Sequence, residues 1–526
     1  MAGNVTGLVA QVGASAAAGA DINRLPATVD TDSALETSSR HRSPHLRRRG
    51  SRSVCPSETD QFPPGFTHAR QASNRSVPPR STPHSSTSSP ASTTPQPRLP
   101  ARPTHPHQME DTTMSERNPM DRNTTSRQRA LVVGLGISGT ASALRLHRAG
   151  WDVVVLEKAP ERRRGGYFIA LFGTGLAAAE RLGFADAVPN RFAPDSVSYD
   201  VDRTGRRRRG MGYADVFGGS RMVMRGDIED AAFTALPDEV EIRYSTVPTA
   251  LDQYLDGVDV EIRDLTTETT TVERFDLAVG ADGLRSTVRR LAFEPEQSPI
   301  RRLNYMIAVY GLPEPVPGYG PQDGLVMAEA GRSVWVFSFA DRPPTVLFSY
   351  RTDDVDAEFT RPAIDSLRAA YGPEPTGSTL GWLLDQFEKA PDHLFDSAEQ
   401  VHLDHWHRGR VVLVGDAAWC LTVYSAMGAS TGLAGADLLG TMLERHPHDV
   451  PRALQDWEDH LRPFIDHHLG NAVSQRSFFT PGNRAELLLR SAMIRLARLP
   501  IAGRLLAKMM ANRARMKSLD IAADAA

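Results

Sequence analysis

Cysteine is nearly absent from this sequence of 526 residues, which contains only Cys55 and Cys420. Two isolated cysteines give neither a disulfide framework nor metal-ligand spacing, so we expect no metal and a reduced, cytoplasmic setting. The net charge is also small, at −3, which gives no electrostatic basis for binding nucleic acid. The sequence also lacks an apolar run of about eighteen residues, so we expect no membrane span.

The first part of the chain has few aromatic residues and little hydrophobic periodicity. Residues 1–126 are rich in Ser, Thr, Pro, His and Arg, and such a segment cannot bury enough apolar surface to offset its ordering entropy. We predict a disordered, low-complexity N-terminal extension. A basic cluster at residues 47–49 would suit a targeting or nucleic-acid arm. We favour a solvated tail, or translated sequence upstream of the true start, because Met109, Met114 and Met120 lie just before the predicted fold.

A glycine-rich turn follows the apolar run at residues 130–133. Its GxGxxG spacing is typical of dinucleotide sites: the first glycine permits a tight turn, the second lets the backbone approach a pyrophosphate, and the third lets the next helix pack on the strand. The N–H groups that begin this helix would point at the diphosphate. The residues predicted to form this cradle are Gly134, Gly136, Ile137, Ser138 and Gly139.

A second strand is predicted at residues 152–156, which are mostly β-branched and apolar. It ends at Glu157, where a carboxylate can accept hydrogen bonds from the hydroxyls of an adenosine ribose. Strand, glycines, helix, strand and acid therefore occur in the order that a dinucleotide-binding unit requires.

Two further segments combine an apolar strand with a turn that carries an acid. Residues 276–280 lead into Asp282 and Gly283, with a helix expected to begin near Ser286, and residues 411–414 lead into Gly415 and Asp416. A strand that returns to the first sheet places such polar groups at its carboxyl edge, where sheets of this kind bind ligands.

The three motifs, taken in this order over about residues 129–470, resemble the flavoprotein monooxygenases of the p-hydroxybenzoate hydroxylase type. The resemblance implies that the first motif holds the ADP half of FAD, and that the segment around Asp282 serves both FAD and NAD(P)H. It also implies that Asp416 hydrogen-bonds the ribityl chain of the flavin, that Arg225 contacts the cofactor, and that Gly428 lies near the flavin ring. The helix that begins there could stabilise negative charge on the flavin.

The chain departs from the common pattern of this family after Asp416. Where many members have a histidine and then a proline, this sequence has Trp419 and Val423, and Ala426 replaces a common glycine. These positions lie beside the expected reactive face, so the substrate and the reaction type are less defined than the binding of FAD.

Residues 299–352 contain several strand-like runs rich in Val, Phe, Tyr and Trp, without crossover helices between them. Such a succession favours an antiparallel sheet. We therefore predict an α/β fold: a Rossmann-like FAD-binding domain with an inserted antiparallel β-sheet substrate domain and a helical C-terminus. The predicted divisions are residues 127–195, 226–298 and 401–450 for the FAD-binding domain, 196–225 and 299–400 for the substrate domain, and 451–526 for the C-terminal helices.

The resemblance implies a monooxygenase that consumes NADPH or NADH and inserts one oxygen atom from O₂ into a small aromatic or polyketide-like substrate. One alternative is a flavoprotein reductase or dehydrogenase that acts on a lipid or isoprenoid without oxygen insertion; another is a non-enzymatic FAD-binding protein. No side chain can be assigned as catalytic, since His402, His405 and His407 are more simply explained as surface residues.

The C-terminal region contains an apolar segment, residues 487–499, with interspersed arginines at Arg490, Arg495 and Arg498. Such a helix could lie on a membrane surface, or pack its apolar face on the protein while the arginines reach solvent. From the sequence we favour packing.

Overall fold

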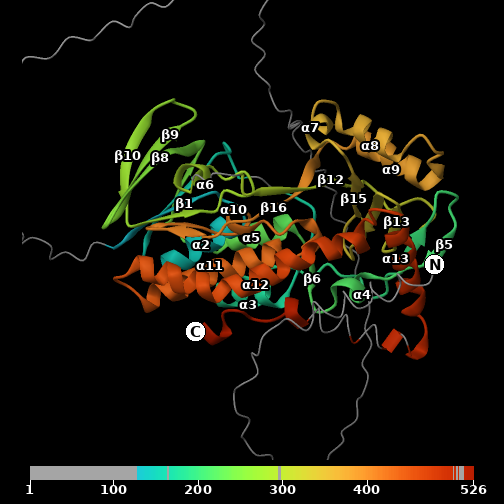
Figure 1. Ribbon diagram of the computed structural model, residues 1–526. Coiled ribbons are helices and arrows are strands. Elements are labelled where there is room, and N and C mark those ends of the chain that lie inside the picture. Colours follow the sequence, from blue (N-terminus) through green and yellow to red (C-terminus); the bar gives the residue numbers. More distant parts are fainter. Residues whose placement is uncertain are drawn as a thin grey trace, which may run out of the picture. The chain divides into compact units, whose positions relative to one another are not determined.

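The computed structural model describes residues 127–162, 165–293, 298–501, 503–504, 508 and 515–525 (Figure 1). The predicted disordered extension, residues 1–126, lies outside these ranges. Within the described part of the chain, no helix is long and apolar enough to cross a membrane. The same residues contain no cluster of His, Cys, Asp and Glu side chains suited to a metal ion.

Short apolar strands form a six-stranded sheet that is parallel except at one edge, where β17 runs antiparallel to β18. Strands β1, β2 and β11 are buried almost throughout, as expected for a parallel sheet covered on both faces. In sheet order the strands are β17 (His407–Arg408), β18 (Val411–Leu413), β11 (Leu277–Gly280), β1 (Arg129–Val133), β2 (Asp152–Glu157) and β7 (Glu241–Tyr244).

Helices cover one face of this sheet and a small antiparallel sheet covers the other (Figure 1). On the helical side, α2 (Ile137–Arg148) packs against α11 (Gly428–Arg445), and α11 in turn contacts α3 (Gly173–Arg181) and α12 (Val450–Phe479). The small sheet has the order β10 (Thr270–Phe275), β9 (Gly257–Asp264) and β8 (Thr246–Tyr254). Helix α11 is therefore central, and its residues from Ser430 to Gly440 are buried.

A second large sheet has seven strands and is antiparallel except for the parallel pair β4 and β13. Its two faces differ because successive side chains of a strand point to opposite sides. Val334 and Val336 pack in a cluster with α8 (Ala363–Tyr371) and α9 (Gly377–Lys389), whereas Trp335 belongs to a different cluster on the opposite face. The strand order is β16 (His393–Val401), β12 (Ile300–Gly311), β15 (Thr345–Arg351), β14 (Arg332–Phe337), β13 (Gly324–Glu329), β4 (Ser198–Val201) and β5 (Arg207–Arg209).

The remaining elements connect or flank these layers. A two-stranded ribbon pairs β3 (Phe168–Leu171) with β6 (Arg221–Met224), and the short helix α4 (Tyr213–Phe217) precedes β6. The other helices are α5 (Arg225–Thr234), α6 (Thr287–Ala292), α7 (Val355–Glu358), α10 (Asp416–Trp419) and α13 (Arg484–Leu496), with 3-10 turns at Ala185–Ala187, Val423–Ser425 and Ala523–Ala525.

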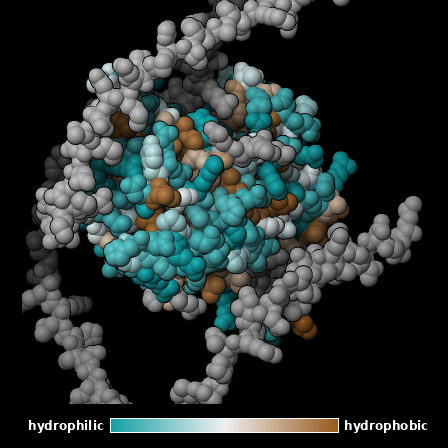
Figure 2. Space-filling view, turned by 60° about the vertical axis from the view of Figure 1, so that its left-hand side comes forward, coloured by the Kyte–Doolittle hydropathy of each residue, from teal (hydrophilic) through white to brown (hydrophobic). Residues whose placement is uncertain are grey.

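The predicted fold class is confirmed. A Rossmann-like sheet with helices, an antiparallel sheet inserted between its strands, and a helical C-terminal region are all present. On the face shown in Figure 2, hydrophobic side chains are scattered among hydrophilic ones, which is the ordinary condition of a protein surface.

Three buried tryptophans, Trp406, Trp419 and Trp457, pack against one another in the core where α10 and α12 meet. Trp457 is fully buried and its indole N–H donates to the carbonyl oxygen of Gly435. We expect Trp457→Ala to lower the free energy of unfolding by about 3–5 kcal/mol, because it leaves a large cavity. Trp382→Ala, at a half-buried position of α9, should cost less. Urea unfolding of both variants tests this, and equal losses would contradict it.

Candidate active site

The turn between β1 and α2 has no room for side chains at two of its glycines. Gly134 has φ of +101°, and a Cβ there would lie 2.7 Å from the carbonyl oxygen of Ala281. A Cβ on Gly139 would lie 1.9 Å from the carbonyl oxygen of Gly134. The backbone of the turn thus touches both the following helix and the segment after β11.

The N-terminus of α2 is open to an anionic ligand. Its N-cap residue, Gly136, provides no side-chain cap, and the first turn contains no acid, so the helix dipole and the first N–H groups keep their attraction for negative charge. At the end of β2 the Glu157 carboxylate accepts hydrogen bonds from the N–H of Leu135 at 2.9 Å and of Ala159 at 2.8 Å. The predicted acid therefore lies against the glycine turn.

The turn after β18 meets the first turn directly. Gly415 has φ of +67°, and a Cβ there would lie 2.2 Å from Oγ of Ser138; a Cβ on Gly432 of α11 would lie 2.4 Å from the same atom. Gly428, at the start of α11, would place a Cβ 3.7 Å from Oδ1 of Asp416. The structure thus brings together the cradle at residues 134–139 and the Gly415–Asp416 turn.

Asp416 is exposed, yet burial by surrounding protein raises its pKa. The carboxylate is therefore accessible from solvent although much protein surrounds it. The positive charge of Arg225 acts in the opposite direction on this pKa, and Arg225 forms an ion pair with Glu229 at 2.6 Å. Burial likewise raises the pKa of Tyr167, on which Arg225 and Asp416 also act. Charges of both signs thus lie close to the glycine turn, where a Cβ on Gly136 would be 3.7 Å from the Arg225 guanidinium and 3.9 Å from the Glu229 carboxylate.

The carboxylate of Asp282 forms hydrogen bonds within the protein. It accepts hydrogen bonds from the N–H groups of Thr287 at 2.6 Å and Val288 at 3.2 Å, at the N-terminus of α6. The backbone at residues 281–282 contacts Gly134. The main chain of this segment therefore borders the glycine turn, while the Asp282 carboxylate binds the N-terminus of α6.

Arg289 is a buried residue of the site that the sequence reasoning did not single out. Its guanidinium donates to the carbonyl oxygens of Ala417 at 2.7 Å and Leu284 at 2.5 Å, and burial lowers its pKa. Arg289 thus ties the segment after β11 to α10. Its position one turn after Asp282 and Gly283 could have marked Arg289 as a site residue from the sequence alone. Nothing in the sequence indicates that it binds the carbonyl oxygen of Ala417.

The unusual residues after Asp416 have different surroundings. Trp419 faces the core, where its indole N–H donates to Oγ1 of Thr431 at 3.2 Å and its ring lies 4.7 Å from that of Trp406. Val423 instead borders the cluster around Trp335. Thr422 and Ala426 have φ values of 69° and 55°, an uncommon conformation for residues with side chains. The loop before α11 is therefore held in a strained form.

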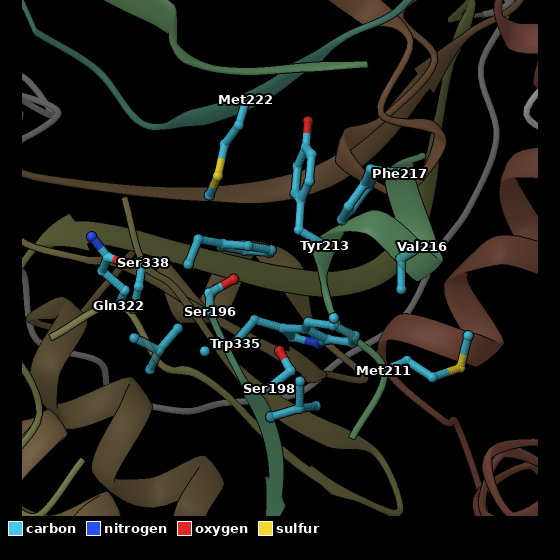
Figure 3. Close-up of a pocket in the computed structure, with 15 residues that line it drawn as sticks. Ser196, Ser198, Met211, Tyr213, Val216, Phe217, Met222, Gln322, Trp335 and Ser338 are labelled. Atoms are coloured by element: carbon cyan, nitrogen blue, oxygen red, sulfur yellow. The ribbon is translucent and has the colours of Figure 1, made fainter. Parts of the chain in front are cut away.

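A small cavity of about 30 Å³ lies between α4 and strands β4, β13 and β14 of the second sheet (Figure 3). Phe337 of this cavity stacks on Phe168 of β3, with ring centroids 4.1 Å apart, and Phe168 directly follows Tyr167 in the sequence. The cavity thus lies next to the segment that carries Tyr167. Its lining contains no charged side chain and consists of Ser196, Ser198, Met211, Gly212, Tyr213, Val216, Phe217, Met222, Gln322, Gly324, Val326, Trp335, Val336, Phe337 and Ser338.

The three histidines considered from the sequence do not line this cavity. The His402 ring contacts Oε1 of Gln400 at 3.2 Å. His405 is exposed, and His407 lies beside Glu458. None of the three is placed to act on a molecule in the cavity.

Comparison with known proteins identifies the family. The model of the FAD binding domain family matches residues 127–448. An FAD-dependent monooxygenase of Sarocladium schorii, asL4, is 27% identical over 383 residues, which cover 66% of this chain and 86% of the relative. A flavin-dependent monooxygenase of Legionella longbeachae is 25% identical, covering 64% and 85%.

Solved structures agree on the fold. The tetracycline destructase Tet(51) superposes with a TM-score of 0.60 at 22% identity, over 75% of this chain and 99% of that one. A variant of Klebsiella pneumoniae HpxO complexed with FAD gives a TM-score of 0.59 at 18% identity, over 74% and 99%.

The protein is therefore a flavoprotein oxidoreductase of the monooxygenase class, and the chain belongs to the FAD binding domain family. The resemblance to monooxygenases of the p-hydroxybenzoate hydroxylase type is confirmed. The observed residues fit FAD: two glycine turns leave room for its backbone contacts, and the uncapped N-terminus of α2 suits its diphosphate.

The close contact at Gly139 predicts a specific loss. Gly139→Ala should leave the purified protein with little bound flavin, because the new methyl group would push α2 away from the turn. The visible absorbance per protein measures this, with circular dichroism to confirm folding. Gly311→Ala is a matched control, since a Cβ there meets no atom within 4 Å. Full flavin content in Gly139→Ala would refute the role of this contact.

Proposed function

We propose that this protein oxidises NADPH or NADH and inserts one oxygen atom from O₂ into a small aromatic or polyketide-like substrate. The observation that carries the proposal is an uncharged cavity lined by aromatic side chains, next to the segment of Tyr167, on whose pKa Asp416 and Arg225 both act. Bound FAD would supply the redox and oxygen chemistry. The protein would bind the cofactor, orient the substrate and keep water out.

The proposed FAD contacts divide between the two ends of the cofactor. At one end the turn at residues 134–139 and α2 hold the diphosphate, and Glu157 binds the ribose. At the other end Asp416 and Arg225 face the flavin part, and the N-terminus of α11 stabilises negative charge there. The full set of proposed cofactor-binding residues is Gly134, Gly136, Ile137, Ser138, Gly139, Glu157, Arg225, Asp282, Asp416 and Gly428.

The lining of the cavity supports a ring-shaped, neutral substrate. Aromatic side chains of α4 and β14 line it, and its polar side-chain groups are serine hydroxyls, the Tyr213 hydroxyl and the Gln322 amide. A cavity of about 30 Å³ holds little more than a water molecule, so a ring must part side chains such as Tyr213 and Phe337 to enter. Among the structural neighbours, HpxO is described in complex with FAD and uric acid, which is itself a ring compound.

Polar groups near the cavity offer no general base. The Tyr213 hydroxyl lies 2.7 Å from Oγ of Ser220, and burial raises its pKa, so it stays protonated at neutral pH. We therefore assign no catalytic side chain. The names of the relatives favour oxygen insertion over the alternative, a reductase acting on a lipid or isoprenoid.

Oxygen transfer is directly measurable. We expect the purified, yellow protein to oxidise NADPH or NADH with matching O₂ uptake when a suitable phenolic or polyketide compound is present. With ¹⁸O₂, mass spectrometry should find one labelled oxygen in the product. Two results would instead establish the reductase: no label in the product under ¹⁸O₂, and NAD(P)H oxidation without oxygen that is coupled to hydrogenation of a lipid.

Asp416 should contribute to flavin affinity. We expect Asp416→Ala to weaken FAD binding by about 1.5–3 kcal/mol, the usual value of a hydrogen bond to a charged group, which is about ten- to a hundredfold in Kd. Titration of the apoprotein with FAD, followed by flavin fluorescence, measures the change. Asp385→Ala, at an exposed position of α9, is the control, and equal affinities of the two variants would contradict the proposed contact.

A further inference from the structure

Helix α13 turns its leucines outward. Leu488, Leu489 and Leu496 are 71%, 55% and 46% exposed, and Leu499, just beyond the helix, is 52% exposed. At 3.6 residues per turn these positions fall on one side of a helix, together with Ala485 and Ala492, which are also exposed. We call this set the leucine face. Exposed apolar side chains that gather on one side of a helix, with polar residues at the border, are typical of a site that contacts a protein or a membrane.

The opposite side of α13 fixes this orientation. Arg490 is 6% exposed and donates to the carbonyl oxygen of Phe478 and to Oδ1 of Asp200, both at 3.1 Å. Its guanidinium carbon also lies 5.8 Å from the centre of the Trp335 ring. Ile494, one turn later, is 6% exposed. Because Arg490 and Ile494 anchor the inner side, the leucines cannot turn inward without breaking these contacts.

The leucine face has a basic border. Arg484, Arg495 and Arg498 are exposed, and the structure shows no ion pair for any of them among the described residues. The one acid of α13, Glu486, is held at 2.8 Å by Arg476. The surface therefore combines apolar side chains with uncompensated positive charge, although the whole chain has a net charge of −3.

We propose that the leucine face docks this protein onto the surface of an anionic lipid bilayer. Leucines would enter the boundary between headgroups and acyl chains, and the arginines would contact the negative headgroups. With 13 residues, α13 is shorter than the roughly 20 residues needed to span a bilayer, so it lies in the interface plane. A second copy of the chain is a poorer occupant, because it would bring an equally basic border to the same contact.

The docked helix would lie close to the substrate cavity. Trp335, which lines the cavity, is the side chain over which the Arg490 guanidinium lies. An apolar substrate dissolved in the bilayer would thus have a short path to the cavity. Docking itself does not depend on the proposed reaction, so binding to lipid and oxygen transfer can fail independently.

Vesicle sedimentation of the full, flavin-loaded chain tests the proposal. We expect the protein to bind vesicles of phosphatidylcholine with phosphatidylserine, less at high salt, and not to bind vesicles of phosphatidylcholine alone. Replacing Leu488 and Leu496 by serine should weaken binding by about tenfold for each leucine, from the apolar area left in water. Arg495→Gln and Arg498→Gln should weaken it by about fivefold each.

Matched substitutions elsewhere on the surface distinguish binding through the leucine face from nonspecific adsorption to vesicles. Leu255→Ser replaces a leucine that is 97% exposed, and Arg208→Gln removes an exposed charge from β5; neither should change vesicle binding. Absence of binding to anionic vesicles, or binding that survives the Leu488 and Leu496 changes, overturns the proposal. Concentration-dependent dimerisation that these changes abolish would do so too, by assigning the leucine face to a second copy.

Discussion

Close approach of the main chain at three glycines is the constraint on which the rest of this structure depends. Gly134 touches the segment after β11, Gly139 touches the turn that precedes it, and Gly415 touches Ser138. These contacts join segments from the beginning, middle and end of the fold, and none leaves space for a β-carbon. Asp416 and Arg225 lie near this junction, because Asp416 directly follows Gly415 and the Arg225 guanidinium approaches Gly136.

The parts of this site that the sequence could predict are those written in local patterns. Strand, glycine turn, helix and terminal acid follow one another within about thirty residues, and Glu157 indeed lies against the turn. The contact of Arg289 with Ala417 could not be predicted, because Ala417 lies on a distant segment. Asp282 shows the opposite limit: its place in a motif was evident, but only the structure shows its carboxylate capping α6.

The second sheet illustrates the same division. Runs of β-branched and aromatic residues predicted its strands, and alternation within β14 determines which side chains can share a face. The pairing of β4 with β13 was not predictable, because it joins segments far apart in sequence and runs parallel within an otherwise antiparallel sheet. That pairing brings Ser198 beside Gly324, and both residues line the aromatic cavity.

Helix α13 shows how one buried charge can decide the orientation of an ambiguous helix. Its sequence suits either packing of the leucines or exposure of them, since both orientations leave some arginines in solvent. Asp200 offers an acceptor to Arg490, and Trp335 and Phe478 offer ring faces to its guanidinium. Turning the helix to bury its leucines would separate the Arg490 guanidinium from these partners and leave Asp200 without its ion pair. Stabilisation of Arg490 on the inner side therefore outweighs burial of the leucines, and the apolar side is left for a surface outside the protein.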